Sequence, residues 1–295
     1  MNSLQSHFIK YLLRRSNLWN KPLEEIRKSM ERFKGKGIPD DVEFSKELIS
    51  GVPCEVFRYR KAKESRKKAV LYFHGGGFSL GIYSPTREFV AKIAQKTGAD
   101  VILPDYRLAP EEPFPAALED GRAVYQGVLQ KGYVPEELVI AGDSSGCALG
   151  VSVLLSGREE GVPMPGACCF ITPVFNISDE AVFNKARWKR DPFCLVDPLG
   201  IAKNYSDAES RKSPLASPLL ADLKELPPVL IHAAEDDVFF EDSQQFAKKI
   251  KSFGGSCEVK NHKGMWHLFH MQDDIVPESR KAFSEFCSGL QAFNG

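Results

Sequence analysis

Ser144 has the clearest chemical potential in this 295-residue chain, because it lies at the centre of the segment GDSSG, residues 142–146. The segment fits the G-x-S-x-G pattern of a nucleophile elbow, a strained turn that presents a serine hydroxyl between a strand and a helix. The flanks match: residues 138–141 form a short apolar run of strand length, and residues 147–155 form an apolar helical run. A chance match in a surface loop is the alternative. The strand-turn-helix context favours Ser144 as a nucleophile.

A second glycine-rich segment, HGGGF at residues 74–78, follows another apolar run of strand length. Consecutive glycines expose backbone N–H groups that can stabilise the oxygen of a tetrahedral intermediate, and the elbow adds the amide after the nucleophile. We therefore expect an oxyanion hole made by Gly75, Gly76 and Ser145. A phosphate-binding loop is the alternative, but neither a Lys-Ser/Thr ending nor G-x-G-x-x-G spacing is present.

A serine hydroxyl is a weak nucleophile at neutral pH, so it needs a histidine base and an acid that orients the base. In chains with a nucleophile elbow, the acid and then the histidine follow the serine. The base candidates come after the last convincing strand, residues 257–260, and are His262, His267 and His270. The acid candidates are consecutive at the end of an apolar run and are Glu235, Asp236 and Asp237. These residues alone leave both assignments open.

The chain resembles the hormone-sensitive-lipase-like branch of the α/β-hydrolases. Besides HGGGF and GDSSG, it carries DYRLAPEEPFPAALED at residues 105–120, close to that family's signature between a strand and a helix. The three motifs occur in the family's order and spacing, and the match runs from about Val70 to the C-terminus. Ser145 departs from the alanine of many relatives, which leaves the backbone donor intact and adds a hydroxyl to the pocket. The resemblance implies a mostly parallel central sheet, helices on both faces and a helical cap.

The resemblance also implies which candidates carry out the chemistry. GMWHLF, residues 264–269, is similar to the family's G-x-x-H-x-F segment and implies His267 as the base. The family places its acid three residues after a small residue and two residues before a large apolar one, a pattern that Asp237 meets. Asp236 is the alternative acid, and is otherwise expected to be a solvated loop carboxylate.

The remaining histidines and the cysteines are expected to serve the structure. His74 anchors the oxyanion loop, His232 is a hydrogen-bonded core residue, and His262 ends a strand. His270 is expected to be a partly exposed helix residue. Seven cysteines, an odd number in a chain of this length, predict free thiols, with Cys147 as a packing residue. No C-x-x-C pair or H-E-x-x-H helix indicates a metal, and the implied reaction needs no cofactor.

Charge and hydropathy exclude several other classes. The chain has 39 basic and 39 acidic residues, so no global field favours nucleic acid. Lys10, Arg14 and Arg15 interrupt the N-terminal apolar pattern, so we expect no signal peptide or membrane span and a cytoplasmic location. Apolar residues at helical spacing predict an amphipathic first helix whose apolar side needs cover: Leu4, Phe8, Tyr11 and Leu12. A helix on a membrane surface is the alternative.

Alternating strand-like and helical patterns predict an α/β fold, with a largely parallel sheet covered on both faces. The first strands are expected within residues 47–59. Later strands are expected to end near Phe73, Leu103, Ala141, Pro173, Ala234 and Lys260. We expect one catalytic domain over residues 1–295, and the resemblance implies cap pieces at about 1–45 and 178–213.

These features predict a carboxylic-ester hydrolase that forms an acyl-enzyme, and the resemblance implies short to medium acyl chains. An apolar acyl pocket is expected from residues whose alternative role is core packing: Phe78, Leu80, Phe175, Phe193 and Leu195. Two other functions stay open, an amidase or deacetylase with the same triad and a non-catalytic binding protein on the same fold. Pairing of an edge strand at residues 258–261 would give a homodimer.

Overall fold

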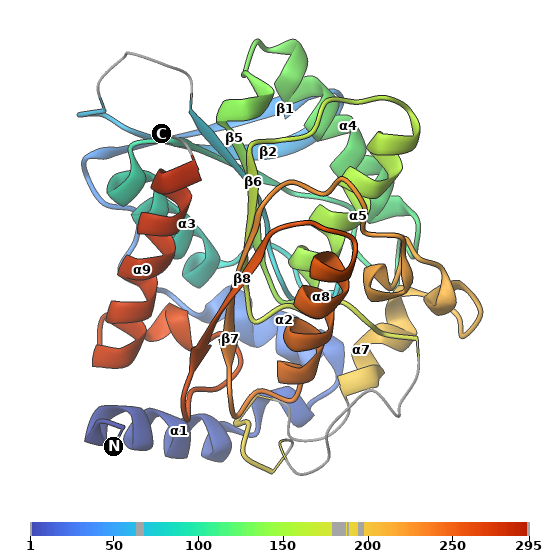
Figure 1. Ribbon diagram of the computed structural model, residues 1–295. Coiled ribbons are helices and arrows are strands. Elements are labelled where there is room, and N and C mark those ends of the chain that lie inside the picture. Colours follow the sequence, from blue (N-terminus) through green and yellow to red (C-terminus); the bar gives the residue numbers. More distant parts are fainter. Residues whose placement is uncertain (1, 63–67, 179–186, 188, 194–197, 294–295) are drawn as a thin grey trace.

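An eight-stranded sheet forms the centre of the fold (Figure 1). The computed structural model describes residues 2–62, 68–178, 187, 189–193 and 198–293. The strands are β1 (Val42–Ile49), β2 (Val52–Tyr59), β3 (Ala69–Phe73), β4 (Asp100–Pro104), β5 (Leu138–Asp143), β6 (Ala167–Ile171), β7 (Val229–Ala234) and β8 (Cys257–His262). Their order is β1-β2-β4-β3-β5-β6-β7-β8. β2 pairs antiparallel with β1 and β4, and the other neighbours are parallel, which confirms the predicted sheet.

Burial explains why the inner strands are easier to predict than the edge. β3, β5 and β6 are buried at every residue, and uninterrupted apolar runs are typical of strands covered on both faces. β1 lies at an edge of the sheet, where charged residues such as Glu43 and Lys46 interrupt the apolar pattern. It begins at Val42, before the expected range of 47–59.

Helices cover both faces of this sheet (Figure 1). The α-helices are α1 (Leu4–Ser16), α2 (Leu23–Arg32), α3 (Ser84–Thr97), α4 (Ala116–Gln130), α5 (Ser145–Glu159), α7 (Pro198–Tyr205), α8 (Phe240–Ser252) and α9 (Pro277–Phe293). The 3-10 helices are η1 (Leu18–Asn20), η2 (Pro135–Glu137), η4 (Ser210–Lys212), η5 (Pro218–Leu220) and η6 (Phe269–Gln272). α3 and α9 share one hydrophobic cluster, while α4, α5 and α8 share a second cluster across the sheet.

The first helix, α1, exposes the apolar stripe that the sequence predicts to be covered. All four predicted residues are exposed, Leu4 by 85% and Phe8 by 58%. Ile9 and Leu13 pack against the core instead. The helix is confirmed, but the expectation that the rest of the chain covers this stripe is wrong. The face that packs on the chain instead carries Lys10, which forms an ion pair with Asp236.

Two stretches distant in sequence meet beyond the C-terminal ends of the parallel strands, where Figure 1 shows α1 at the bottom of the view and α2 and α7 alongside the lower part of the sheet. They are residues 2–33 and the described residues of 187–213. The Trp19 and Phe193 rings lie 5.2 Å apart, and the Arg14 guanidinium donates to two main-chain carbonyls of the second stretch. We refer to these two stretches as the cap segments.

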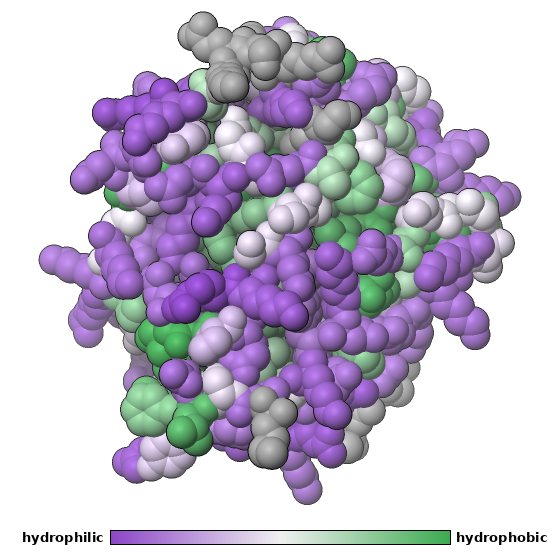
Figure 2. Space-filling model, turned by 60° about the vertical axis from the view of Figure 1, so that its left-hand side comes forward, coloured by the Kyte–Doolittle hydropathy of each residue, from purple (hydrophilic) through white to green (hydrophobic). Residues whose placement is uncertain are grey.

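The surface in Figure 2 is hydrophilic over most of its area and carries small hydrophobic patches. Among the described residues, no helix combines the length and the apolar character that a bilayer span requires. β8 is one of the two edge strands of the sheet, the position that pairing between two chains requires. A homodimer through this edge stays a prediction, and so does the cytoplasmic location.

Candidate active site

Ser144 lies in a tight turn between β5 and α5. Its backbone has φ 50° and ψ −123°, a strained conformation for a residue with a side chain. A Cβ at Gly146 would lie 2.0 Å from the carbonyl oxygen of Phe73, and a Cβ at Gly142 would lie 2.6 Å from the same atom. β3 therefore approaches the turn so closely that both positions require glycine, as the sequence predicts.

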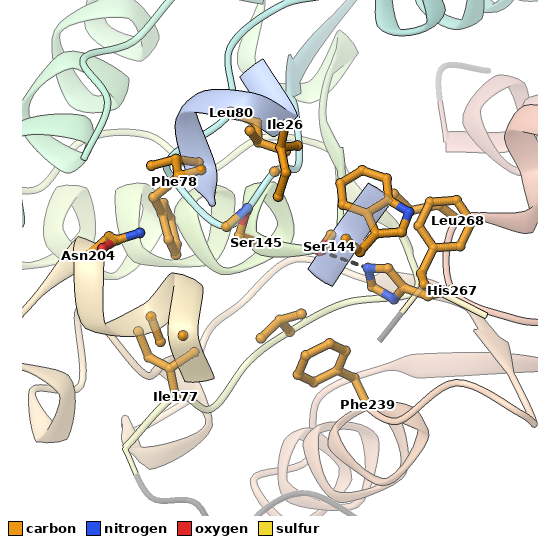
Figure 3. Close-up of a pocket in the computed structure, with 18 of the residues that line it drawn as sticks. Ile26, Phe78, Leu80, Ser144, Ser145, Ile177, Asn204, Phe239, His267 and Leu268 are labelled. Carbon is orange, nitrogen blue, oxygen red and sulfur yellow. Dashed lines mark hydrogen bonds between the residues drawn. The ribbon is translucent and has the colours of Figure 1, made fainter. Parts of the chain in front are cut away.

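The three predicted catalytic side chains meet beyond the C-terminal ends of the strands. Ser144 follows β5, Asp237 follows β7, and His267 lies in the loop after β8. The His267 Nε2 atom is 2.9 Å from Ser144 Oγ (Figure 3), and Nδ1 is 2.9 Å from Asp237 Oδ2. All three side chains are buried. The alternative acid, Asp236, forms an ion pair with Lys10 instead.

A fourth group, the carboxylate of Asp191, reaches the triad from the cap segments. Its Oδ2 atom accepts from the backbone N–H of His267 at 3.3 Å and of Val238 at 3.4 Å, and its Oδ1 accepts from Phe193 N–H at 2.9 Å. The side chain is fully buried. Sequence reasoning missed it, and the available signal was an acid directly before Pro192 in the stretch expected to form the second cap piece.

Burial and charge set the protonation of these groups. Burial lowers the pKa of His267, but nearby carboxylates outweigh it, so its pKa is raised above the ordinary value. These carboxylates are Asp237, Asp191 and Asp143. Burial and the charge of Asp237 raise the pKa of Asp191 to about 7, and burial raises that of Asp143 to about 6. The site therefore favours the imidazolium that forms when a histidine base takes a proton.

The glycines that face the cavity lie one residue further along the chain than expected. The backbone of Gly75 hydrogen-bonds the Asp143 carboxylate, and a Cβ at Gly75 would lie 2.3 Å from Asp143 Oδ2. Gly76 and Gly77 line the cavity beside the nucleophile, whereas Gly75 does not. The predicted use of Gly75 as an oxyanion donor is therefore wrong, because its amide is committed to a neighbouring carboxylate. Ser145 lines the cavity as expected.

The segment 105–120 packs against this glycine loop and forms hydrogen bonds with it. The Tyr106 hydroxyl donates to the carbonyl of His74 at 2.7 Å, and the two rings stack 4.3 Å apart. The backbone N–H of Ala109 donates to the carbonyl of Phe78 at 2.8 Å. Burial lowers the pKa of His74 to about 4, so this ring is neutral at neutral pH. His74 therefore lies in the anchoring position that the sequence predicts.

A cavity of about 350 Å³ opens onto Ser144 and His267 (Figure 3). Phe78, Leu80 and Phe193 line it, as expected. Its other lining residues come mainly from the cap segments and the loop after β6: Trp19, Asn20, Lys21, Leu23, Ile26, Val174, Ile177, Gly200, Ala202, Asn204, Phe239 and Leu268. The lining is therefore largely apolar, with a few amide and amine groups from the cap segments.

Two of the residues expected in the pocket are not confirmed there. Phe175 is fully buried and stacks on Phe246 at 3.9 Å, so its placement in the pocket is wrong. Asp242 accepts from the backbone N–H of Phe175 at 2.8 Å and fixes this backbone within the core, while Val174 and Ile177 line the cavity instead. Leu195 lies outside the described residues.

The remaining histidines and cysteines lie in the core. His232 is fully buried in β7, and His262 ends β8, as predicted. His270 is also fully buried, so its expected partial exposure is wrong, because its ring packs between Phe269 and other histidines. Cys147 is buried and its thiol donates to a backbone carbonyl, consistent with packing. The cysteines among the described residues are all buried and free.

Known proteins share the sequence pattern and the fold of this chain. Residues 70–271 match the family model for the alpha/beta hydrolase fold. An acetyl-hydrolase of Streptomyces hygroscopicus is 30% identical over 269 residues, which cover 91% of this chain and 88% of that protein. EstE5, in a crystal soaked with p-nitrophenyl butyrate, is 34% identical with a TM-score of 0.90, and the match covers 99% of both chains.

A crystal structure of an esterase from the bacterial hormone-sensitive lipase family is 28% identical, with a TM-score of 0.90 over 100% of both chains. The three motifs that carry the sequence resemblance also meet at one place here, since the glycine loop contacts both the segment 105–120 and the serine turn. This chain therefore belongs to the α/β-hydrolase fold family, in its hormone-sensitive-lipase-like branch.

Proposed function

We propose that this protein is a carboxylic-ester hydrolase that works through an acyl-enzyme on Ser144. The observation that carries the proposal is the pair of 2.9 Å contacts from His267, one to Ser144 Oγ and one to Asp237 Oδ2. His267 takes the hydroxyl proton as Ser144 attacks the ester carbonyl. Asp237 holds the imidazole in the required tautomer and stabilises its protonated form.

The reaction proceeds in two halves. In the first half, Ser144 Oγ bonds to the carbonyl carbon, and the carbonyl electron pair moves to the oxygen. Collapse of this intermediate expels the alcohol, which takes the proton from His267. In the second half, water gives a proton to His267 and attacks the acyl-enzyme. The acid leaves, and Ser144 regains its proton.

The amides of Gly76, Gly77 and Ser145 are the proposed oxyanion donors. Both glycines line the cavity beside Ser144, and Ser145 begins α5, whose N-terminal partial positive charge favours a developing anion. The Gly77 amide contacts Ser145 Oγ at 2.9 Å. A substrate oxygen must therefore replace this contact before Gly77 donates to it.

The cavity supports acyl chains of short to medium length. Its volume of about 350 Å³ and its apolar lining fit such a chain, and the cap segments contribute much of that lining. The related protein EstE5 was soaked with p-nitrophenyl butyrate, and another relative is named acetyl-hydrolase, so short acyl groups recur among relatives. The contact of Trp19 with Phe193 supports a single cap, over about 1–45 and 178–213, on one catalytic domain.

The test is the initial rate of hydrolysis of p-nitrophenyl esters from acetate to decanoate. We expect measurable rates that peak at a short or medium chain, and a loss of at least about 10³-fold in Ser144→Ala. Ser145→Ala is the matched control, because it alters the adjacent hydroxyl and keeps the backbone donor. It should retain most of the activity.

Matched p-nitroanilides separate an esterase from an amidase, since the amide has a poorer leaving group. Ester rates well above amide rates would support the proposal. Equal and slow rates of the wild type and Ser144→Ala on every ester would contradict it, and binding without turnover would favour a receptor function.

A further inference from the structure

Three histidines form a cluster that the proposed reaction does not use. His232 lies in β7, His262 ends β8, and His270 lies in η6. Ala234 pairs with His262 across the two parallel strands, and His232 lies two residues before Ala234. Because side chains alternate along a strand, His232 and His262 project from the same face of the sheet. The ring of Phe286, from α9, packs against both His232 and His270.

One ring nitrogen of each histidine lies close to the other two. The Nδ1 atom of His232 is 3.1 Å from the Nε2 of His270 and 3.1 Å from the Nε2 of His262. All three nitrogens lie within 4.8 Å of one another. Two imidazole nitrogens bound to one Zn²⁺ at about 2.0–2.1 Å lie about 3.3 Å apart in a tetrahedral site. The two observed separations are therefore close to those of ligands that share one metal ion.

The cluster is also neutral, as metal-binding imidazoles must be. Burial lowers the pKa of His262 to about 4, and burial and the neighbouring rings lower those of His232 and His270 well below the ordinary value. Each ring then offers one lone pair.

Hydrogen bonds among the three rings do not satisfy all of their ring nitrogens. The Nδ1 atom of His232 carries either a hydrogen or a lone pair, so it satisfies one of its two neighbours at a time. On the outer side of the rings, His232 Nε2 and His270 Nδ1 have no hydrogen-bond partner within the described residues. No group of the described residues therefore fixes the tautomers of His232 and His270, so their inner nitrogens can present lone pairs to a cation.

We propose that His232, His262 and His270 form a binding site for a divalent transition metal, Zn²⁺ in the first place. Imidazole nitrogens suit this class of ion, and three histidines leave a fourth position for water. His262 is only partly buried, so its side of the cluster is the entry path. The ion joins β7, β8 and η6.

This site is separate from the triad but lies on the same loops. The carbonyl of His262 accepts from the backbone N–H of Glu235 at 3.1 Å, close to the loop that carries Asp237. His270 follows His267 by three residues. A bound ion thus braces both loops and should raise the unfolding temperature without being required for ester hydrolysis. The sequence predicts no metal, because these ligands are too far apart in the chain to form a recognised motif.

The test measures binding of Co²⁺, which gives visible absorption bands, and of Zn²⁺ in competition with a coloured chelator. We expect one ion per chain, an increase in unfolding temperature, and affinity that falls by more than about 100-fold in His262→Gln, because even outer partners of ligands cost about 10–100-fold. His7→Gln, which removes an exposed histidine of α1, should bind like the wild type.

A second cluster of possible ligands, Asp191, Asp237 and His267, requires its own control. Asp191→Asn should leave the stoichiometry and affinity unchanged. Zn²⁺ soaked into crystals of the wild type should give anomalous density between the three rings, which tests the proposal even if His262→Gln fails to fold. Absence of binding, unchanged affinity in a folded His262→Gln protein, or density at the triad instead would overturn it.

Discussion

His267 and His270 lie three residues apart, both buried, yet their surroundings act on them in opposite ways. His267 faces the carboxylates of Asp237 and Asp191, and its pKa is raised. His270 faces two other imidazoles, and its pKa is lowered well below the ordinary value by burial and by those rings. Burial favours the neutral ring in both cases, so the neighbouring charges make the difference. Carboxylate neighbours suit a proton acceptor, whereas imidazole neighbours suit a ligand of a cation.

The largest effect should come from exchanging each histidine for glutamine. In His267→Gln we expect kcat/KM on p-nitrophenyl butyrate to fall by at least about 10⁴-fold, because Ser144 loses its base. In His270→Gln the loss should stay below about tenfold, since this ring touches neither Ser144 nor the cavity. Comparable losses in two folded variants would break the distinction between the two histidines.

The adjacent carboxylates of the β7 loop give the next largest contrast. Asp237→Asn should lower kcat by about 10³- to 10⁴-fold, because the amide favours the wrong tautomer of His267. Asp236→Asn is the matched control, and we expect it to lose less than about tenfold, since Asp236 pairs with Lys10. Steady-state kinetics of both variants decide the point. A larger loss in Asp236→Asn would reassign the acid.

The pH dependence of kcat/KM sharpens the account of His267. The base must be neutral, so activity falls as pH drops through its pKa, and the raised pKa places this acid limb above about pH 6.5. Asp191→Asn removes one carboxylate that raises this pKa, so the limb should move to lower pH. The rate near pH 6, relative to pH 8, should rise roughly two- to threefold.

Asp191 acts as a positioning residue in this account, because it holds the backbone of His267 and does not reach the reacting atoms. The expected shift of the acid limb is modest. Burial and Asp237 raise the pKa of Asp191 itself to about 7, which leaves this carboxyl partly protonated near neutral pH. If the acid limb of the pH profile is unchanged in a folded Asp191→Asn protein, then the charge of Asp191 does not raise the pKa of His267.

The smallest expected effect concerns stability. The pKa of His270 is lower in the folded protein than in the unfolded chain, so acid favours unfolding below about pH 6.5 as the unfolded chain takes up protons. Between about pH 7 and pH 5, the wild type should lose up to about 2 kcal/mol more unfolding free energy than His270→Gln. Urea unfolding in chelator-containing buffer measures this difference, and the buried carboxylates common to both proteins largely cancel. An equal loss would show that His270 is not a buried neutral ring.

Much of the fold could be predicted because each chemical motif follows a buried strand. The runs before HGGGF and GDSSG are apolar at every position, and Gly142 and Gly146 are required by the approach of β3 to the serine turn. Ser144 could therefore be predicted from local sequence and motif order, whereas His267 is distinguished among three downstream histidines by its similarity to a family segment. Asp237 also depended on a family pattern, since the sequence does not show which of three consecutive carboxylates turns inward.

What could not be predicted depends on contacts between distant parts of the chain. The Gly75 amide hydrogen-bonds Asp143, whereas Gly76 lines the cavity. Phe175 packs in the core, where its ring stacks on Phe246. Asp191 reaches His267 from 76 positions away, which no spacing rule anticipates. The exposed stripe of α1 shows the same limit, because the helical period is visible in the sequence but the docked face is not.

The most direct test of the central claim is mass spectrometry of protein mixed with p-nitrophenyl butyrate and quenched in acid within the first turnovers. We predict a mass increase of one butyryl group, located on the peptide that contains Ser144 and absent in Ser144→Ala. Slower release in water-poor solvent should increase the modified fraction. A butyryl group on another residue, or rapid turnover with an unmodified Ser144 at every time point, would contradict the acyl-enzyme mechanism.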